Sequence, residues 1–394
     1  MAPPLSITTR LERRLTNNDT YGHTPLHKAF DQLDVYGIGY DEARAARSPV
    51  RLGLVGVGGV AQSKYFPAVA RLRTLWEPVE IAAFVEPRAD HARKIQAIYG
   101  GTIYSTLAAM LASESLHGVV VLSPDEQHAD HALQALTAGC AVLVEKPITR
   151  SLVTADRLCH FADNQQQTLM AVANKRCSPP YRQAKKAVEL WSSTPAMFSG
   201  KFNLGYPYVD LLESGTIHLL DLVRFYMGDV VRLNAVAVNR YNRNQRHYPI
   251  DNVAVTFEFA SGAIGSLISS GSALSFKPWE RVEIYGDGRW LAVEDQHELS
   301  LYDSETGPTK SWRPVIPNTL MFDEEFGGYV DLLENFIQVI RGAAQPIVTG
   351  WDGYRALELL RAIQLSIIQH NPVELPLDPL TAEADVQRWL PAQP

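Results

Sequence analysis

Short apolar runs alternate with helical patterns over residues 50–144 of the chain. The predicted strands are a run that starts at Val50, then Val79–Val85, Val119–Leu122 and Ala141–Val144; the predicted helices between them are Gln62–Leu75, Arg88–Tyr99 and Glu126–Ala138. These strand runs are continuously apolar, which is typical of parallel strands buried on both faces. The short connections between strand and helix favour a parallel sheet covered by helices on both sides.

The pattern changes after about residue 178. Apolar residues alternate with polar or small ones in Val253–Phe259, Ala263–Ser270 and Val282–Tyr285, as expected for antiparallel strands with one buried face. The stretches Val330–Ile340 and Gly353–His370 predict long helices. We therefore predict an α/β protein with a Rossmann domain over residues 50–175 and an α+β domain over residues 176–376.

The two ends of the chain lie outside this pattern. Residues 1–49 combine turn-forming residues with the aromatic side chains Tyr21, Phe30, Tyr36 and Tyr40. Disordered segments contain few aromatic residues, so this stretch is either a flexible leader or an arm that packs on the body or on a partner subunit. Residues 377–394 are expected to form a tail, and the helix before them is expected to pack back on the Rossmann domain.

Composition excludes several classes of protein. The 394 residues include 36 Lys and Arg and 43 Asp and Glu, for a net charge of −7, so the basic face that nucleic acids require is not expected. No apolar run approaches the roughly 20 residues of a membrane span, and the first residues lack the apolar core of a secretory signal. The scattered Cys140, Cys159 and Cys177 form no metal-binding pair and are expected to be reduced thiols of a cytoplasmic protein.

A glycine-rich loop follows the first predicted strand. Gly56-Val57-Gly58-Gly59-Val60-Ala61 matches G-x-G-x-x-A between a strand and a helix, the context that supports a dinucleotide site. The first glycine permits the tight turn, the second lets the backbone approach a pyrophosphate, and the helix N-terminus attracts its charge.

The end of the second predicted strand carries Glu86, followed two residues later by Arg88. An acid at this place accepts hydrogen bonds from ribose hydroxyls and repels a 2′-phosphate, so NAD is favoured as cofactor, while Arg88 leaves NADP possible. The alternative is that Glu86 is a solvated strand end.

Two further strand ends carry candidate cofactor contacts. Ser123 and Pro124 follow the third strand, and His128 is expected on the next helix beside the cofactor. Glu145, Lys146 and Pro147 follow the fourth strand. An ammonium group at this edge can hydrogen-bond a reacting oxygen and stabilise the negative charge that develops on it, so Lys146 is a candidate catalytic residue.

A predicted helix from about Gly215 to Met227 carries a histidine and an acid. Ser214, His218 and Asp221 are spaced four and three residues apart, which places them on one helical face. A histidine oriented by an acid is a suitable general base, although a structural core histidine is the alternative. Tyr206 precedes this helix and lines either the substrate pocket or the core.

Together these motifs resemble the Gfo/Idh/MocA family, named after glucose-fructose oxidoreductase and inositol dehydrogenase. The matching segments, within about residues 50–376, are Gly56–Ala61, Ser123-Pro-Asp-x-x-His128, Ala138–Pro147, Arg176-x-x-Pro-x-Tyr181, His218-x-x-Asp221, Val348-Thr-Gly-x-Asp-Gly353 and Ala362-Ile-x-x-Ser366. The resemblance implies NAD(P)-dependent oxidoreduction of sugars, cyclitols or their derivatives. It also implies a large, mostly antiparallel open sheet in the second domain, through which homodimers or homotetramers form.

The resemblance also implies roles for individual residues. Lys146 would contact both substrate and nicotinamide, and His218 would be the acid/base, while Asn174 and Arg176 would line the cofactor and substrate pocket. One position departs from the family: many members carry an aspartate four residues before the histidine, where this chain has Ser214. Either Glu213 substitutes for it, or Asp221 orients the imidazole, or this member works differently.

Two functions follow. The first is an enzyme that moves a hydride between a nicotinamide and a hydroxyl-bearing carbon, with Tyr206 and Ser214 among the residues that contact substrate. The second is a non-catalytic regulatory protein that retains the dinucleotide and ligand sites. The departure at Ser214 favours this second function, and the presence of Lys146 and His218 disfavours it.

Overall fold

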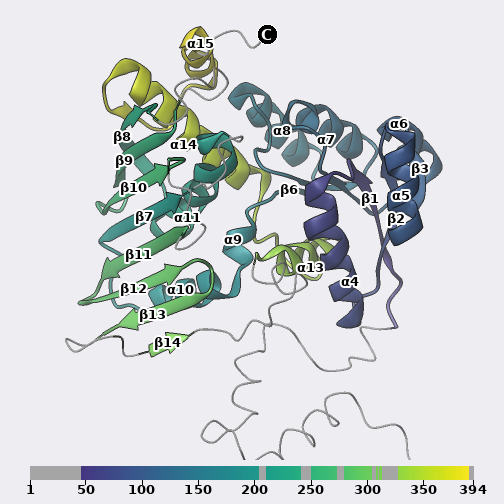
Figure 1. The fold of residues 1–394 in the computed structure, drawn as a ribbon, viewed down its shortest axis with the longest axis horizontal. Helices are drawn as coiled ribbons and strands as arrows, with labels where there is room; N and C mark the ends of the chain where they lie inside the picture. The colour runs from purple at the N-terminus through teal and green to yellow at the C-terminus, as the bar shows by residue number, and fades with distance from the viewer. Residues whose placement is uncertain are drawn as a thin grey trace, which may run out of the picture.

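The computed structural model describes residues 46–203, 210–240, 250–272, 279–303, 308, 310–312 and 327–389. In this part of the chain, two sheets lie side by side with helices between them and around the first sheet (Figure 1). Nearly all of the predicted leader and the residue Tyr206 lie outside the described residues.

The first sheet is parallel, with the strand order β3-β2-β1-β4-β5-β6. Its strands are β1 (Val50–Val55), β2 (Val79–Val85), β3 (Thr102–Tyr104), β4 (Gly118–Val121), β5 (Ala141–Val144) and β6 (Leu169–Ala171). Its helices are α4 (Phe66–Thr74), α5 (Ala89–Tyr99), α6 (Leu107–Ser113), α7 (His128–Thr137) and α8 (Leu152–Asn164), and a π-helical turn, Ala61–Tyr65, leads into α4. The predicted Rossmann sheet is confirmed, and its order reverses between β1 and β4, where such sheets bind ligands.

The second sheet is mixed and larger. Within the described residues it has nine strands in the order β14-β13-β12-β11-β7-β10-β9-β8-β15, and every pair of these is antiparallel except β7 with β10. The strands are β7 (Met197–Asn203), β8 (Val230–Val238), β9 (Asn252–Phe259), β10 (Ile264–Ser270), β11 (Glu280–Gly286), β12 (Arg289–Glu294), β13 (Glu298–Tyr302), β14 (Lys310–Trp312) and β15 (Val373–Glu374). Alternate residues of β9 and β10 are buried, so one face packs on helices, and the predicted open sheet is confirmed.

Helices fill the space between the two sheets (Figure 1). They are α9 (Asn174–Cys177), α10 (Pro179–Glu189), α11 (Ile217–Met227), α13 (Tyr329–Ile340) and α14 (Gly350–Gln369). The long helix α14 contacts β8 and α11 on one side and α8 and β6 on the other. A continuous hydrophobic core therefore joins the two halves of the chain.

The segments near the C-terminus return to the Rossmann half. Helix α13 packs on α4, although it follows the second sheet in the sequence. The predicted tail contains a helix that the sequence analysis did not predict, α15 (Pro379–Trp389), which contacts α8 and α14.

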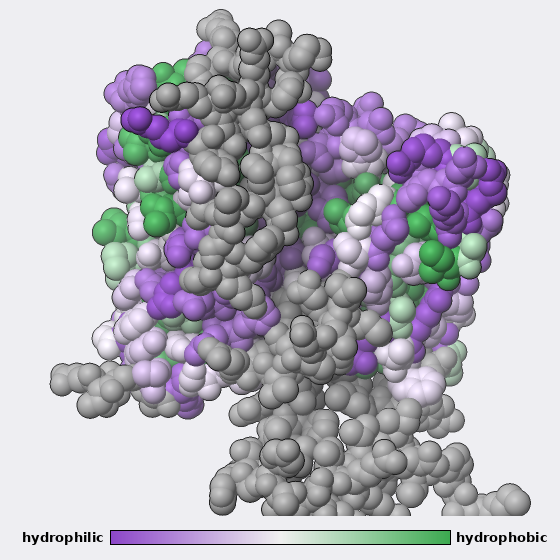
Figure 2. All heavy atoms as spheres, in the orientation of Figure 1, coloured by the Kyte–Doolittle hydropathy of each residue, from purple (hydrophilic) through white to green (hydrophobic). Residues whose placement is uncertain are grey.

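The outer face of the second sheet carries exposed apolar side chains (Figure 2). In the part of the chain that the structure describes, no helix has the length and apolar character needed to cross a bilayer. The same part holds no cluster of three potential metal ligands, and its three cysteines are free and buried.

Candidate active site

The glycine loop lies at the edge of the parallel sheet where β1 and β4 end. Gly56 has φ of +90°, and a Cβ atom on it would lie 2.7 Å from the carbonyl oxygen of Leu122, so the turn requires glycine. A Cβ atom on Gly58 or Gly59 would meet no atom within 4 Å. Helical residues begin at Gly59, and the first N–H groups of a helix have no partner within the helix. The loop therefore fits a dinucleotide, whose diphosphate would occupy the open space before this helix.

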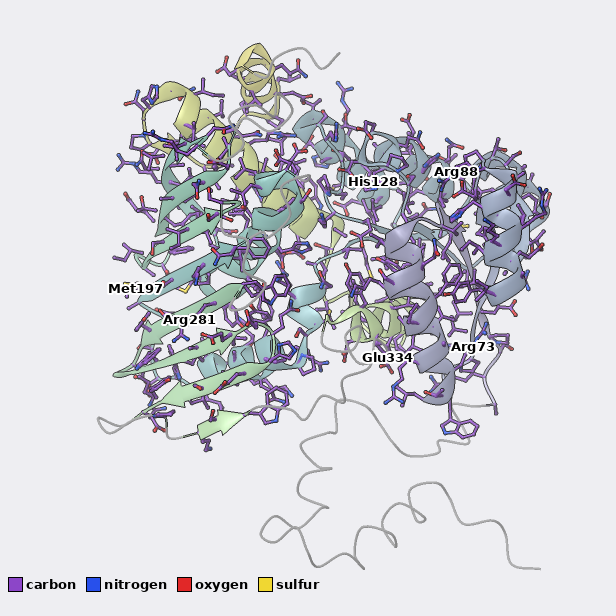
Figure 3. All side chains as sticks on the ribbon, viewed as in Figure 1. Arg73, Arg88, His128, Met197, Arg281 and Glu334 are labelled. Carbon is purple, nitrogen blue, oxygen red and sulfur yellow. The ribbon has the colours of Figure 1, made fainter. Side chains whose placement is uncertain are left out.

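Glu86 and Arg88 form a pair at the end of β2. The buried Glu86 carboxylate accepts hydrogen bonds from Arg88 Nε at 2.7 Å and Nη2 at 3.2 Å, and from the Arg88 backbone N–H at 3.1 Å. These hydrogen bonds from Arg88 lower the pKa of Glu86 and keep it ionised. The Arg88 side chain is otherwise exposed, on the Rossmann half of the molecule (Figure 3).

His128 connects the two strand ends that carry the remaining predicted cofactor contacts. Its ring nitrogens lie 2.8 Å from the carbonyl oxygen of Ser123 and 2.8 Å from that of Pro147. His128 is fully buried, and Figure 3 shows it on the Rossmann half. His128 therefore lies between the loop that starts with Ser123 and Pro124 and the turn that follows Lys146.

Glu145 lies in a buried cluster beneath that turn. Its carboxylate accepts a hydrogen bond from Tyr65 Oη at 3.2 Å and from the Lys146 backbone N–H at 2.9 Å, and Tyr329 Oη lies at 3.5 Å. Burial raises the pKa of Glu145, against the opposing effect of Lys146. Glu145, predicted as a cofactor contact, thus connects the turn at Lys146 to the helix after the glycine loop and to α13.

The segment with the histidine begins earlier than the sequence indicated. A π-helical turn, Leu211–Thr216, precedes α11, and Asp210 caps it by accepting a hydrogen bond from the Glu213 N–H at 2.7 Å. This turn brings the carbonyl oxygen of Ser214 to 3.3 Å from Lys146 Nζ. Ser214 therefore contacts the lysine through its backbone.

Lys146 and His218 both line one cavity between the two halves of the molecule. Residues of β6, α11 and α14 line it as well. Burial lowers the pKa of His218 well below its ordinary value, and the positive charges of Lys146 and Lys175 lower it further. The imidazole is thus neutral at pH 7 and able to accept a proton.

Lys175, whose charge lowers the pKa of His218, was not predicted from the sequence. Its side chain is buried, pairs with the buried Glu280, and lies 4.7 Å from the ring centre of Trp279. Burial lowers the pKa of Lys175. A lysine beside an arginine is expected at a surface, and the groups that bury Lys175 come from β11 and the residue before it, about a hundred positions later.

The acids near His218 have other partners. Asp221 Oδ2 accepts a hydrogen bond from Arg176 Nε at 2.7 Å, and Glu213 Oε1 from Arg361 Nη1 at 3.3 Å. Among the described residues, no carboxylate hydrogen-bonds to His218. The Asp221 and Glu213 carboxylates are thus bound by arginines, and the three alternatives for the position of the family aspartate stay predictions.

Two more predicted contacts take part in packing. Arg176 binds Asp221 and Asp352, so its buried guanidinium points toward two carboxylates. Asn174 Nδ2 donates a hydrogen bond to the carbonyl oxygen of Gly327, which anchors the start of α13 beside β6. Neither side chain lines the cavity that Lys146 and His218 share, and the contacts of Arg176 with the cofactor and of Asn174 with substrate stay predictions.

The fold and the site together define a two-domain protein with a dinucleotide cradle and a lysine–histidine cavity between the domains. Family models agree: residues 50–173 match an oxidoreductase family with an NAD-binding Rossmann fold, and residues 211–375 match the C-terminal α/β domain of the same family. The chain belongs to the Gfo/Idh/MocA family of NAD(P)-dependent oxidoreductases.

Individual relatives cover nearly the same region. An inositol 2-dehydrogenase of Rhizobium meliloti is 25% identical over 83% of this chain and 99% of its own length. A D-apiose dehydrogenase of Paraburkholderia graminis is 26% identical over 75% of this chain and 83% of its own. A solved levoglucosan dehydrogenase in complex with NADH superimposes with a TM-score of 0.75 at 18% identity, over 84% of this chain and 100% of its own, and shows the shared fold.

Proposed function

We propose that this protein transfers a hydride between a nicotinamide cofactor and a hydroxyl-bearing carbon of a sugar, cyclitol or related polyol. The observation that carries the proposal is that Lys146 and His218, which come from different domains, line one cavity beside the end of β6. The names of the relatives, which act on inositol and on D-apiose, support a polyol as substrate.

Each residue has a chemical task in this proposal. Bound NAD supplies the hydride acceptor for alcohol oxidation, and NADH supplies the donor for the reverse reaction. The neutral imidazole of His218 removes the hydroxyl proton while the carbon–hydrogen bond breaks, and it returns that proton in the reverse direction. The Lys146 ammonium hydrogen-bonds the same oxygen and stabilises the negative charge that develops there.

The cofactor would be held by the groups around the glycine loop. Backbone N–H groups from Val57 to Val60 would bind the diphosphate. Glu86 would accept hydrogen bonds from the adenosine ribose once Arg88 turns away, and Arg88 would meet the 2′-phosphate of NADP. NAD is therefore the proposed main cofactor, with NADP as a second one.

A turnover panel tests the proposal. Sugars, cyclitols and keto-sugars are mixed with NAD or NADH, and the change in nicotinamide absorbance is followed. Substrate deuterated at the reacting carbon should place its deuterium on the nicotinamide ring. If no compound of a broad panel is turned over while NADH still binds, the regulatory alternative replaces the enzyme. The observation that favours this alternative is that no carboxylate of the described residues hydrogen-bonds to His218.

We also propose that the outer face of the second sheet pairs with a second copy of the chain. Val236 is 65% exposed and Ile268 is 55% exposed, and both are aligned with Ala254 across neighbouring strands. Contiguous apolar surface of this kind marks interfaces. Light scattering of the wild type should give a dimer or tetramer, and the double variant Val236→Glu/Ile268→Glu should give a monomer that still binds NADH; an unchanged mass would exclude this face.

A further inference from the structure

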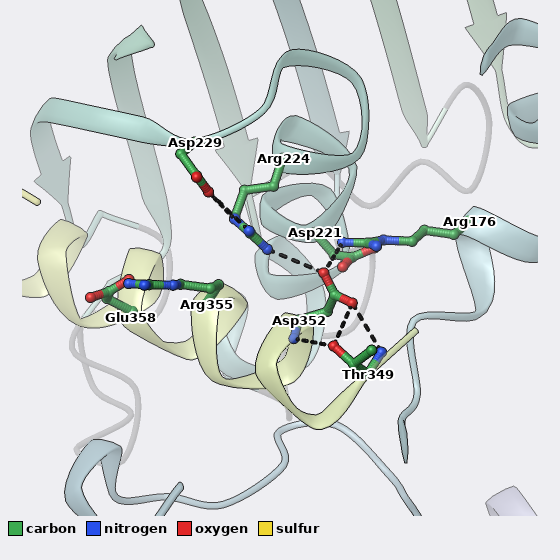
Figure 4. A network of polar contacts seen from close by, with 8 residues as sticks. All are labelled: Arg176, Asp221, Arg224, Asp229, Thr349, Asp352, Arg355 and Glu358. Atoms are coloured by element: carbon green, nitrogen blue, oxygen red, sulfur yellow. Dashed lines mark hydrogen bonds and ion pairs between the residues drawn. The ribbon is translucent and has the colours of Figure 1, made fainter. Parts of the chain in front are cut away.

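A network of charged side chains connects three helices (Figure 4), and one of its members, Asp221, lines the lysine–histidine cavity. Asp352, in the first turn of α14, lies at the centre of the network. Asp352 Oδ1 accepts hydrogen bonds from Arg176 of α9 at 3.1 Å and from Arg224 of α11 at 3.3 Å. Arg176 continues to Asp221 at 2.7 Å, and Arg224 continues to Asp229 at 2.9 Å.

The other oxygen of Asp352 has a separate task. Oδ2 accepts hydrogen bonds from the Thr349 N–H at 2.9 Å and from Thr349 Oγ1 at 2.8 Å, which completes a capping box at the start of α14. One carboxylate therefore fixes the end of its own helix and binds the arginines of two other helices. Arg176, Thr349 and Arg224 lower the pKa of Asp352 despite the opposing effect of its burial, so it is ionised at neutral pH.

The network acts on the helix that carries His218. Asp221 lies three residues after His218 on α11, which places both on the same side of the helix. Arg224 follows three residues later and binds Asp352 directly. On the other side of His218, the Ser214 carbonyl contacts Lys146. Contacts on both sides of the histidine thus fix the position of α11 along its axis and its rotation.

We propose that Asp352 is a positioning residue, which holds the His218 helix through Arg176 and Arg224 so that the imidazole faces Lys146. Asp352 follows His218 by more than a hundred residues and acts only through the two arginines. Asp221, predicted as a catalytic residue, belongs to the same network and acts on His218 through the orientation of α11. This inference rests on the proposed function for its kinetic test, but its structural test does not.

Matched variants separate the two tasks of Asp352. Asp352→Asn removes the charge that the arginines bind. Thr349→Ala removes the two hydrogen bonds of the Thr349 hydroxyl and leaves the arginine contacts of Asp352 Oδ1 in place. Asp352→Glu restores a carboxylate at a position where capping boxes accept glutamate. Arg355→Gln serves as a further control, because Arg355 pairs with Glu358 on the same helix at 2.7 Å, outside the network (Figure 4).

The experiment combines kinetics with hydrogen exchange of the full chain. Asp352→Asn should lower kcat by about tenfold to hundredfold, the range expected when a catalytic group is displaced by about 1 Å. The KM for the polyol and the Kd of NADH should change less than about threefold. Thr349→Ala and Arg355→Gln should keep kcat within about twofold of the wild type, and Asp352→Glu should recover much of the loss.

Hydrogen exchange is the readout that does not depend on turnover. The α11 amides should exchange faster in Asp352→Asn than in Thr349→Ala, even if the two variants melt at the same temperature. If the wild type turns over no polyol, the proposed function fails, and the exchange rates alone decide the role of Asp352. Equal α11 exchange in the two variants would overturn the proposal and leave Asp352 as a helix cap.

Discussion

The same substitution, glycine to alanine, should affect different properties at two positions of the glycine loop. Gly56→Ala places a methyl group 2.7 Å from the Leu122 carbonyl oxygen, in a backbone conformation with φ of +90°. Gly58→Ala places it where no protein atom lies within 4 Å. The first variant should therefore damage the fold, and the second should damage only the binding of the cofactor.

The magnitudes follow from these surroundings. A non-glycine residue in the strained turn costs about 1–3 kcal/mol, which lowers Tm by roughly 2–10 °C for a domain of this size. At Gly58 the added methyl would displace a phosphate from the helix N-terminus and weaken charge-assisted hydrogen bonds worth about 1.5–3 kcal/mol each. Because about 1.4 kcal/mol corresponds to a tenfold change, the Kd of NADH should rise about tenfold to hundredfold.

Two measurements decide the outcome. Thermal unfolding of the free protein should show Gly56→Ala below the wild type and Gly58→Ala equal to it. Titration of NADH fluorescence should show weak binding by Gly58→Ala. Wild-type affinity of a correctly folded Gly58→Ala variant would show that no phosphate approaches this loop, and the assignment of the cradle would be refuted.

Three further predictions concern the chemistry and the choice of cofactor. Lys146→Ala should lower the rate at least about tenfold, because the developing charge on the substrate oxygen loses its partner; unchanged kinetics would remove Lys146 from the mechanism. The pKa of His218 is lowered below the ordinary 6.5, so kcat/KM for alcohol oxidation should fall only as the pH drops through that lowered value. Lys175→Met removes a positive charge and should move this fall to higher pH. If the pH profile of Lys175→Met equals that of the wild type, the electrostatic effect of Lys175 on His218 is contradicted. Arg88→Ala should weaken NADP binding relative to NAD by about tenfold, whereas Glu86→Gln should favour NADP; equal preferences in both variants would exclude this pair from cofactor selection.

The parts of the fold that the sequence predicted are those with local signals. The buried parallel strands were recognisable as continuous apolar runs, and Gly56–Ala61 was recognisable because it lies between a strand and a helix. The start of the His218 segment was missed, because the π-helical turn Leu211–Thr216 depends on the Asp210 cap and on packing, and not on helical periodicity. The C-terminal helix α15 was missed for a similar reason, since its weak pattern gains stability from contacts with α8 and α14.

The site was predicted as a set of residues, but not as a set of contacts. Lys146 and His218 were identified from motifs, and the structure places them at one cavity. The ion pair of Asp221 was not predicted, because helical spacing places Asp221 near His218 while the arginine that binds it comes from another helix. Spacing along one helix reports only neighbours on that helix, and the ion pairs of this site connect separate segments.

The most direct test of this account is a crystal structure of the protein with NADH and a bound polyol. If Lys146 and His218 act on the same substrate oxygen, the cofactor diphosphate will lie at the glycine loop. One substrate hydroxyl will then lie within about 2.6–3.2 Å of both Lys146 Nζ and a His218 ring nitrogen. A polyol bound elsewhere, or a hydroxyl that contacts only one of these two groups, would contradict this account.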